Sequence, residues 1–573
     1  MIMHRPSTQV NNSTGKEQPG RVAERSACDY ARRKVILHER PISIPVKIRA
    51  AFVALAALWA SALVLLYTRH NDFPTVYHPD EQFKGKAIVE GKFKFTQPLL
   101  LTSTAGAASW ISAQRHTVQQ AVVVGRWTSA VFAALAVALL AWAAGWQFGP
   151  WAGVAVAVAL GSSHRLLIWA HYMKEDTALL LGLAAFLLAV AAYCAKPTRG
   201  RLTLLGCACG LSLAGKYVGI LTFPLAWYAV RSVARGQGGP IDLGSTGQRP
   251  AAESRSLGPF VMGCAAVLLL VQIPALLHPI DFFDDLYKEI RHPITAHRGL
   301  AQPRLWNSPF WAMYVNEVPW FVAALGGAFA VISAVRWRRQ SVFIRVMLML
   351  AGAYWLGLLC ASFAENRHVL PVAALSHAFA GLALASVIEK LPRVFGIRAA
   401  ALLVGAALFV VPSVRPARAC LDEFRRDTRM VLAEWIARNL RPEDAVAFES
   451  YAALPDDDAM ALGAFAPVAR LKQRLVSAQF LPDLGRIEEI RALGCEYVAV
   501  AETSWARYFS PGVAPQRKHR GEFQWRREWY ERLFKEAELV VEIRPGIDLH
   551  ANSSPVVRLY RLRAAPPQTR PNT

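Results

Sequence analysis

The feature that most limits what this chain can fold into is a series of apolar runs through its first 415 positions. Each run is close to the roughly 20 residues that a helix needs to cross a bilayer. Hydrophobic residues make up 54% of the 573 positions, and the mean hydropathy is +0.25. Because one soluble globular domain cannot bury that much apolar surface, the sequence predicts a polytopic α-helical membrane protein.

The charged residues indicate how the spans are oriented. The formal charge is +23, and basic residues cluster between the apolar runs, which favours loops held on the cytoplasmic side over nucleic-acid binding. The first 47 residues are basic and polar, so we expect a disordered cytoplasmic tail with no cleavable signal peptide. Ten apolar segments follow, at about 48–67, 118–146, 150–170, 177–195, 202–230, 258–278, 310–335, 343–363, 367–388 and 397–414.

One of these segments does not fit a single crossing. If 202–230 crossed once, the basic loops around Arg235 and at 336–339 would both lie outside, against the preference of basic loops for the cytoplasmic side. Two short helices that meet near Lys216 and form a hairpin would return both loops to the cytoplasm. We therefore predict eleven crossings rather than ten, with irregular backbone at Lys216 that lines a cavity.

The chain changes character after position 415. Helical periodicity over 424–440 is followed by three short strand-like runs, at 445–450, 496–501 and 555–562, and by a helical run that Gly494 ends. The sequence thus divides into the tail (1–47), a membrane domain (48–414) with a first outer loop at 68–117, and a small C-terminal α/β domain (415–573). The topology places this last domain outside.

The run HPDEQ, at 78–82, holds two adjacent carboxylates just after the first span. Asp80 could act as a general base or position a ligand, and it could equally cap the helix that Gly91 would close. Both roles are compatible, since a residue at a helix start is held rigidly. Like-charge repulsion from Glu81 would raise the basicity of Asp80.

A second acidic pair, Glu175 and Asp176, begins the span at 177–195 on the same predicted outer side. Acids at a helix start complement the helix dipole, which is their structural interpretation. Two acidic sites on one side of a bundle also suggest a shared cleft. His78, His171 and Glu175 could contribute to a divalent cation site, although their spacing matches no defined motif.

Cations near the same side could bind a phosphate. Arg126 lies inside the second segment, Lys216 lies at the predicted break, and Arg367 and His368 begin the ninth segment. Charges inside a membrane are costly and usually functional. Their structural alternatives are snorkelling and pairing with acids such as Glu365.

These residues lie in motifs that resemble a known family. The stretch at 78–100, with Pro98 and Leu99 after the acidic pair and its helix, resembles the first outer loop of membrane glycosyltransferases that take sugars from polyprenyl phosphates. These are the superfamily of protein O-mannosyltransferases and aminoarabinose transferases, of GT-C fold. Further matches are GRWTSAVFA (125–133), HYMKEDTALLL (171–181), GLSLAGKYVGILTFP (210–224), ENRHVLPVAAL (365–375) and the start of the C-terminal domain, DTRMVLAEWIARNL (427–440).

The resemblance implies roles for individual residues. Asp80 would be the catalytic carboxylate, supported by Glu81 and Asp176. Lys216 and Arg367 would face the donor phosphate, and His368 stands where the family often has Tyr. No cofactor is required by the resemblance, and a divalent cation stays an open alternative.

The implied activity is transfer of a sugar from a polyprenyl-phosphate donor to a lipid, glycan or protein acceptor, with inversion at the anomeric carbon. It would take place on the outer face of a plasma membrane, the bacterial inner membrane, with the C-terminal domain periplasmic or extracellular. The first alternative is a transporter or flippase of a lipid or anionic solute, which only the broken segment at 202–230 supports. The second is a non-catalytic membrane scaffold, which would leave the paired acids and Arg126 without a purpose.

Overall fold

The computed structural model describes residues 46–237, 256–295, 300–301, 308–361, 365–465, 471–510, 513–515, 517–547 and 554–562. Apart from its last two positions, the basic tail predicted over 1–47 lies outside these ranges. The helices of the apolar part are α2 (Val46–Tyr67), α5 (Val118–Phe148), α6 (Pro150–Gly161), α7 (His164–Ala170), α8 (Glu175–Ala195), α9 (Arg199–Gly215), α10 (Thr222–Ala234), α11 (Gly258–Val271), α14 (Pro309–Glu317), α15 (Trp320–Val335), α16 (Val342–Cys360), α17 (Leu370–Lys390) and α18 (Phe395–Arg425).

Within the described ranges, five helices are long and apolar enough to cross a membrane, or seven if each of two bent helix pairs counts as one span. The bends fall within two stretches that the sequence gives as single apolar segments, 150–170 and 310–335. Helices α6 and α7 meet at 65°, where the Ser163 side chain accepts the Leu166 N–H and starts a new helix. Helices α14 and α15 meet at 109° around Pro319, which has no N–H to continue α14.

The predicted break at Lys216 is present. Helix α9 ends at Gly215, a 3₁₀ turn follows (η2, Tyr217–Leu221), and α10 begins at Thr222. The Lys216 ammonium donates to Asp176 at the start of α8, so α9 returns along α8 to the end where α8 began. At the other end, Arg345 near the start of α16 donates to Gln237, which follows α10. The segment therefore forms the expected helical hairpin.

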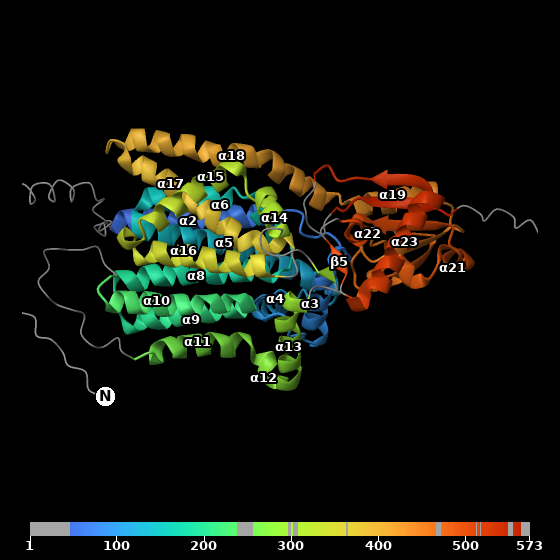
Figure 1. Ribbon diagram of the computed structural model, residues 1–573, viewed down its shortest axis with the longest axis horizontal. Coiled ribbons are helices and arrows are strands. Elements are labelled where there is room, and N and C mark those ends of the chain that lie inside the picture. The colour runs from blue at the N-terminus through green and yellow to red at the C-terminus, as the bar shows by residue number, and fades with distance from the viewer. Residues whose placement is uncertain are drawn as a thin grey trace, which may run out of the picture. The chain divides into compact units, whose positions relative to one another are not determined.

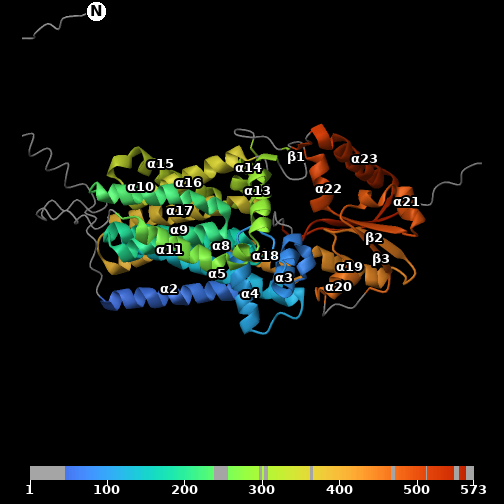
Figure 2. The ribbon, with the colours of Figure 1, turned by 90° about the horizontal axis from the view of Figure 1, so that it is seen from below.

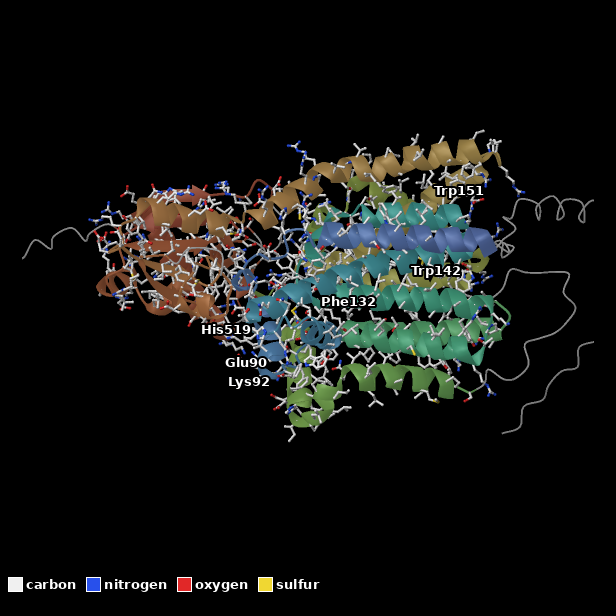
Figure 3. The ribbon with its side chains drawn as sticks, turned by 180° about the vertical axis from the view of Figure 1, so that it is seen from behind. Glu90, Lys92, Phe132, Trp142, Trp151 and His519 are labelled. Carbon is white, nitrogen blue, oxygen red and sulfur yellow. The ribbon has the colours of Figure 1, made fainter. Side chains whose placement is uncertain are left out.

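Small residues bring these helices close together, as Figure 1 shows for α8, α9 and α11. A Cβ atom built on Gly182 of α8 would lie 2.4 Å from the Ser212 Cα of α9, and one on Gly206 would lie 2.0 Å from the Phe260 carbonyl of α11. Helices that pack through backbone contact need such residues, because lipid supplies little hydrophobic force between helices. Figure 3 places Trp142 and Trp151 toward one end of the bundle, and Glu90 and Lys92 toward the other.

Shorter helices lie at the end of the bundle that carries Lys216 and Asp176. They are α3 (Pro79–Glu90), α4 (Leu100–Ile111), α12 (Ile273–Leu277) and α13 (Pro279–Thr295). Three further 3₁₀ turns are η1 (Thr75–Tyr77), η6 (Trp337–Arg339) and η7 (Asn366–Val369). Two residues, β1 (Leu300–Ala301), pair antiparallel with β5 (Ala514–Pro515) of the C-terminal part. Helix α18 continues through position 415 to Arg425, so the α/β part begins with the next helix.

The C-terminal part is built on a mixed five-stranded sheet of order β3-β2-β4-β7-β6, in which β2, β3 and β4 are parallel (Figure 2). The strands predicted at 445–450, 496–501 and 555–562 appear as β2, β4 and β7. The elements are α19 (Thr428–Asn439), β2 (Ala445–Glu449), α20 (Asp457–Ala461), β3 (Arg474–Ala478), η8 (Leu481–Leu484), α21 (Ile487–Ala492), β4 (Tyr497–Ala501), α22 (Glu502–Phe509), η9 (Arg517–His519), α23 (Arg520–Glu536), β6 (Glu538–Ile543) and β7 (Val557–Arg561).

Both faces of this sheet are covered, which explains why its central strands are uniformly apolar. In β2, Ala445 and Ala447 pack in a cluster with α21 and α23, whereas Val446 and Phe448 pack in a cluster with α19. Successive side chains of a strand point to opposite faces, so a strand buried on both sides shows no polar alternation.

The last residue of β2, Glu449, is a fully buried carboxyl group. It accepts the Ala501 N–H and the Tyr530 hydroxyl, each at 2.7 Å. Burial raises the pKa of Glu449 from 4.5 to about 7. Between these two values the folded state binds the extra proton and the unfolded state does not, so this group's contribution to stability falls as the pH rises from about 4.5 to 7.

We expect Glu449→Gln to remove that pH dependence. The loss across this range in the wild type is about 3 kcal/mol, since each pKa unit is worth about 1.4 kcal/mol. Thermal denaturation of the purified protein at pH values from 5 to 8, monitored by a signal from the C-terminal part, measures this loss of stability. Equal pH profiles for the wild type and the variant would contradict the assignment.

Candidate active site

The HPDEQ run forms the first turn of α3, with His78 as N-cap and Pro79 at the first helical position. Asp80 and Glu81 follow in that turn, where the helix dipole favours acidic side chains. Asp80 makes no capping bond, so its interpretation as an N-cap is wrong. The predicted end of the helix is confirmed, because Gly91 closes α3 in the left-handed conformation, with φ 71°.

The two neighbouring acids have different surroundings. The Glu81 side chain is fully buried and forms a two-point ion pair with Arg126, with Nε–Oε1 at 3.1 Å and Nη2–Oε2 at 2.6 Å. It also accepts the Met173 N–H at 2.7 Å. In contrast, the Asp80 side chain is 41% exposed and belongs to a second cluster of charges.

Arg126, a predicted phosphate ligand, is bound to protein groups instead. Its Nη1 donates to the carbonyls of Asn71 (2.8 Å) and Phe73 (2.5 Å), and its guanidinium lies 3.5 Å from the centre of the Phe73 ring. Its side chain has no exposed surface. Arg126 and Glu81 therefore form a buried pair that fixes the loop before α3. This pair is separate from the charged cluster that the other predicted site residues form.

Four other predicted residues do come together around Asp80. Arg367 of η7 reaches Asp80 Oδ2 at 3.5 Å with Nη1, and Asp176 Oδ2 at 3.9 Å with Nε. Lys216, at the break between α9 and η2, donates to Asp176 Oδ1 at 2.7 Å. His368, half-buried, follows Arg367 in η7. The first outer loop, α8, the broken hairpin and η7 thus supply one charged cluster.

Two charged residues of this cluster were not predicted. Lys174, with no exposed surface, donates to Asp80 Oδ2, and Lys84 pairs with Glu175 at 2.5 Å. Glu365, considered above as a pairing partner for the cations, does pair with Arg367, at 2.6 Å. The signal for Lys174 in the sequence is its position directly before the two acids of HYMKED. Lys84 lies one helical turn after Asp80 in α3, on the same side.

The cations determine the charge state of Asp80. Partial burial tends to raise its pKa, but the charges of Lys174, Arg367 and Lys84 hold the pKa of Asp80 well below its usual range. The pKa of Lys174 is lowered by burial and by Arg367, and the pKa of His78 is lowered well below its usual value by burial and by Lys174. Asp80 is therefore ionised and His78 neutral at physiological pH.

A pocket of about 90 Å³ opens beside Asp80, between α3 and the segment that leads into α4. Its lining combines acids, amides and hydroxyls with aromatic rings, and includes Asp80, Lys84 and Glu175. Further lining residues are Phe83, Phe93, Thr96, Gln97 and Thr102.

The residues considered for a divalent cation are not gathered into a metal site. Both ring nitrogens of His171 are within 2.9 Å of backbone carbonyls, those of Leu167 and Arg69, and Glu175 is paired with Lys84. His78 packs against the Tyr172 ring instead. Within the described part of the chain, no three His, Cys, Asp or Glu side chains are placed to hold a metal ion.

No protein-family model matches the chain, and no curated protein matches it. Solved structures match the chain. The chain is similar to ArnT and to an archaeal oligosaccharyltransferase. ArnT from Cupriavidus metallidurans bound to undecaprenyl phosphate is 15% identical, with 90% of this chain and 98% of ArnT covered and a TM-score of 0.44. The apo state of ArnT gives 14% identity, 89% and 98% coverage, and a TM-score of 0.49.

The oligosaccharyltransferase AglB from Archaeoglobus fulgidus, in complex with an inhibitory peptide and a dolichol-phosphate, is 12% identical. The match covers 86% of this chain and 80% of AglB, with a TM-score of 0.48. Two of these matched structures hold a lipid phosphate, undecaprenyl phosphate in ArnT and dolichol-phosphate in AglB.

Proposed function

We propose that this chain is a membrane glycosyltransferase that moves a sugar from a polyprenyl-phosphate donor to an acceptor hydroxyl, with Asp80 as the base. The observation that carries the proposal is the arrangement of the ionised, partly exposed Asp80 beside Arg367, and of Arg367 beside Asp176 and Lys216. A carboxylate able to take a proton lies next to cations able to hold a phosphate.

The leaving group needs no general acid, because a phosphate is stable as an anion. As the bond from the anomeric carbon to the phosphate oxygen breaks, the electron pair leaves with the phosphate. Lys216 and Arg367 would stabilise the charge that grows on it. Both cations now pair with acids, so the donor phosphate would exchange with Asp176 and Glu365 as their counter-ion.

The acceptor oxygen forms its bond to the anomeric carbon while the sugar has oxocarbenium character, and its proton passes to Asp80. A carboxylate with a low pKa is a weak base toward a free hydroxyl. The hydroxyl becomes strongly acidic as its new bond forms, so the proton moves late, when Asp80 can take it. The negative charge of Asp80 also favours the developing positive charge on the sugar.

The pocket beside Asp80 would receive the acceptor. Its lining contains Asp80, Lys84 and Glu175 but not Lys216 or Arg367, so a group bound there approaches Asp80 apart from the phosphate cations. A nucleophile that enters on the face opposite the leaving group produces inversion at the anomeric carbon.

Release of polyprenyl phosphate tests the function. Purified protein in detergent is incubated with a panel of radiolabelled undecaprenyl-phosphate sugars and a cell-envelope extract of lipids, glycans and proteins as the source of acceptor, and free undecaprenyl phosphate is measured with time. We expect one donor to be consumed. A transporter would move the intact lipid without cleaving it, so a panel left whole while the lipid crosses proteoliposome membranes would overturn the proposal.

We expect Arg367→Gln and Lys216→Met each to lower kcat by about 100-fold, because each removes a charge that stabilises the departing phosphate. The matched control is Arg338→Gln, which removes an exposed arginine from η6. Single-turnover release of undecaprenyl phosphate measures the effect. Wild-type kcat in both site variants would exclude the two residues from the phosphate site.

A further inference from the structure

The corner between α18 and α19 contacts the loop that leads into Asp80. Asp427 caps α19, and its carboxylate accepts from Arg429 at three points: the backbone N–H at 2.9 Å, Nε at 2.8 Å and Nη2 at 2.7 Å. It also accepts the Ser554 N–H at 2.7 Å, which ties the corner to the segment before β7. Arg429 has no exposed surface.

The Arg429 guanidinium also binds a residue outside the C-terminal part. Arg429 Nη1 donates to the Tyr77 carbonyl at 3.1 Å, and the guanidinium lies 3.8 Å from the centre of the Tyr77 ring. Tyr77 ends η1 and is separated from Asp80 only by His78 and Pro79. The Glu81 N–H donates to the His78 carbonyl, so this short connection continues directly into the first turn of α3.

The same loop is held from the bundle by Arg126, which binds the carbonyls of Asn71 and Phe73. The Phe73 ring contacts both the Arg126 guanidinium and the Phe424 ring, which stacks on it with centroids 5.2 Å apart. Two buried arginines therefore hold the loop by its backbone. One comes from α5, and the other comes from the first turn of the C-terminal part.

We propose that Arg429 is a positioning residue, through which the C-terminal α/β part fixes the Tyr77 carbonyl and thereby the place of Asp80 in the charged cluster. The proposal rests on the proposed function only for its effect on turnover. A displacement of about 1 Å at a reacting group can cost about 100-fold in rate. The C-terminal part would then complete the active site without touching substrate.

An arginine is needed for this geometry. Its planar fork can satisfy Asp427 on one edge and the Tyr77 carbonyl with the other nitrogen, while stacking on the Tyr77 ring. Lysine keeps the charge that balances Asp427 but has one nitrogen and no planar face. Arg429→Lys should therefore retain the buried ion pair with Asp427 and lose the connection to Tyr77. The variant thus distinguishes the positioning of the loop by Arg429 from the contribution of its charge to the stability of the C-terminal part.

The test compares Arg429→Lys with Arg438→Lys, a control on the same helix whose exposed arginine pairs with Glu434. Hydrogen exchange in the full-length protein is measured on the peptide covering 74–82, with the binding of undecaprenyl phosphate and kcat for the donor that the wild type consumes. For Arg429→Lys we expect about tenfold faster exchange in this peptide, at least a tenfold lower kcat, and unchanged affinity for undecaprenyl phosphate. The control should match the wild type.

Unchanged exchange at 74–82 in Arg429→Lys would overturn the proposal, as would a loss of kcat matched by an equal loss of undecaprenyl phosphate binding. If the protein shows no transferase activity, the exchange measurement still decides whether Arg429 fixes the loop. Asp427→Asn gives a second variant, which keeps Arg429 but weakens its anchor, and the same peptide should exchange faster there too.

Discussion

Replacing Asp80 with asparagine is expected to reduce sugar transfer by at least about 1,000-fold, the scale on which loss of a catalytic base and a stabilising charge act together. The amide matches the carboxylate in size but cannot accept the acceptor's proton. It also removes the negative charge that would face the developing oxocarbenium ion. The measurement is release of undecaprenyl phosphate under single-turnover conditions, in which slow product release does not mask the chemical step.

The fold must be checked in the same variant, because Lys174 has no exposed surface and would lose its carboxylate partner. Asp80→Asn combined with Lys174→Met removes both charges, and we expect it to be as stable as the wild type and still inactive. The matched control is Asp284→Asn, which removes an exposed acid of α13 that pairs with Lys288. Turnover by Asp80→Asn at the wild-type rate would refute the role of Asp80.

Glu81→Ala is expected to destabilise the protein by about 3–5 kcal/mol, the usual result of removing one partner from a buried ion pair. Arg126 would keep its charge in a site without exposed surface, and the Met173 N–H would lose its acceptor. Thermal or denaturant unfolding in detergent measures the effect. The neighbouring Gln82→Ala, outside the pair, is the control and should leave stability nearly unchanged.

The double variant Glu81→Met with Arg126→Met should recover part of the loss, since no unpaired charge is left buried. Recovery stays incomplete because Arg126 also binds two backbone carbonyls. This comparison separates two roles for Glu81. A Glu81→Ala protein with wild-type stability and no turnover would place Glu81 in the chemistry, as the family resemblance implies, and not in the support of the loop.

Much of the membrane part could be predicted because a helix that crosses a bilayer must be apolar along its whole length. The hairpin was also predictable, since charge on the loops left only one consistent path around Lys216. The bend near Pro319 was not, because an apolar run has the same composition whether it is straight or folded back. Only tertiary packing makes that choice.

The site divides in the same way. The acids at 80 and 176 lie just outside predicted spans, and the cations at 216 and 367 lie within or at the start of apolar segments, which is why the sequence shows them. The pairing of Glu81 with Arg126 joins residues 45 positions apart and depends on which side of α3 faces the bundle. Arg429 and Tyr77 are 352 positions apart, so periodicity could not relate them.

The pairing of Lys216 and Arg367 with acids has a consequence for the end of the reaction cycle. A sugar linked to a polyprenyl phosphate leaves that phosphate one negative charge, whereas the free lipid phosphate carries nearly two at neutral pH. The two cations would hold the spent lipid more tightly than the fresh one. In the proposed enzyme, therefore, free undecaprenyl phosphate would compete with the donor for these two cations.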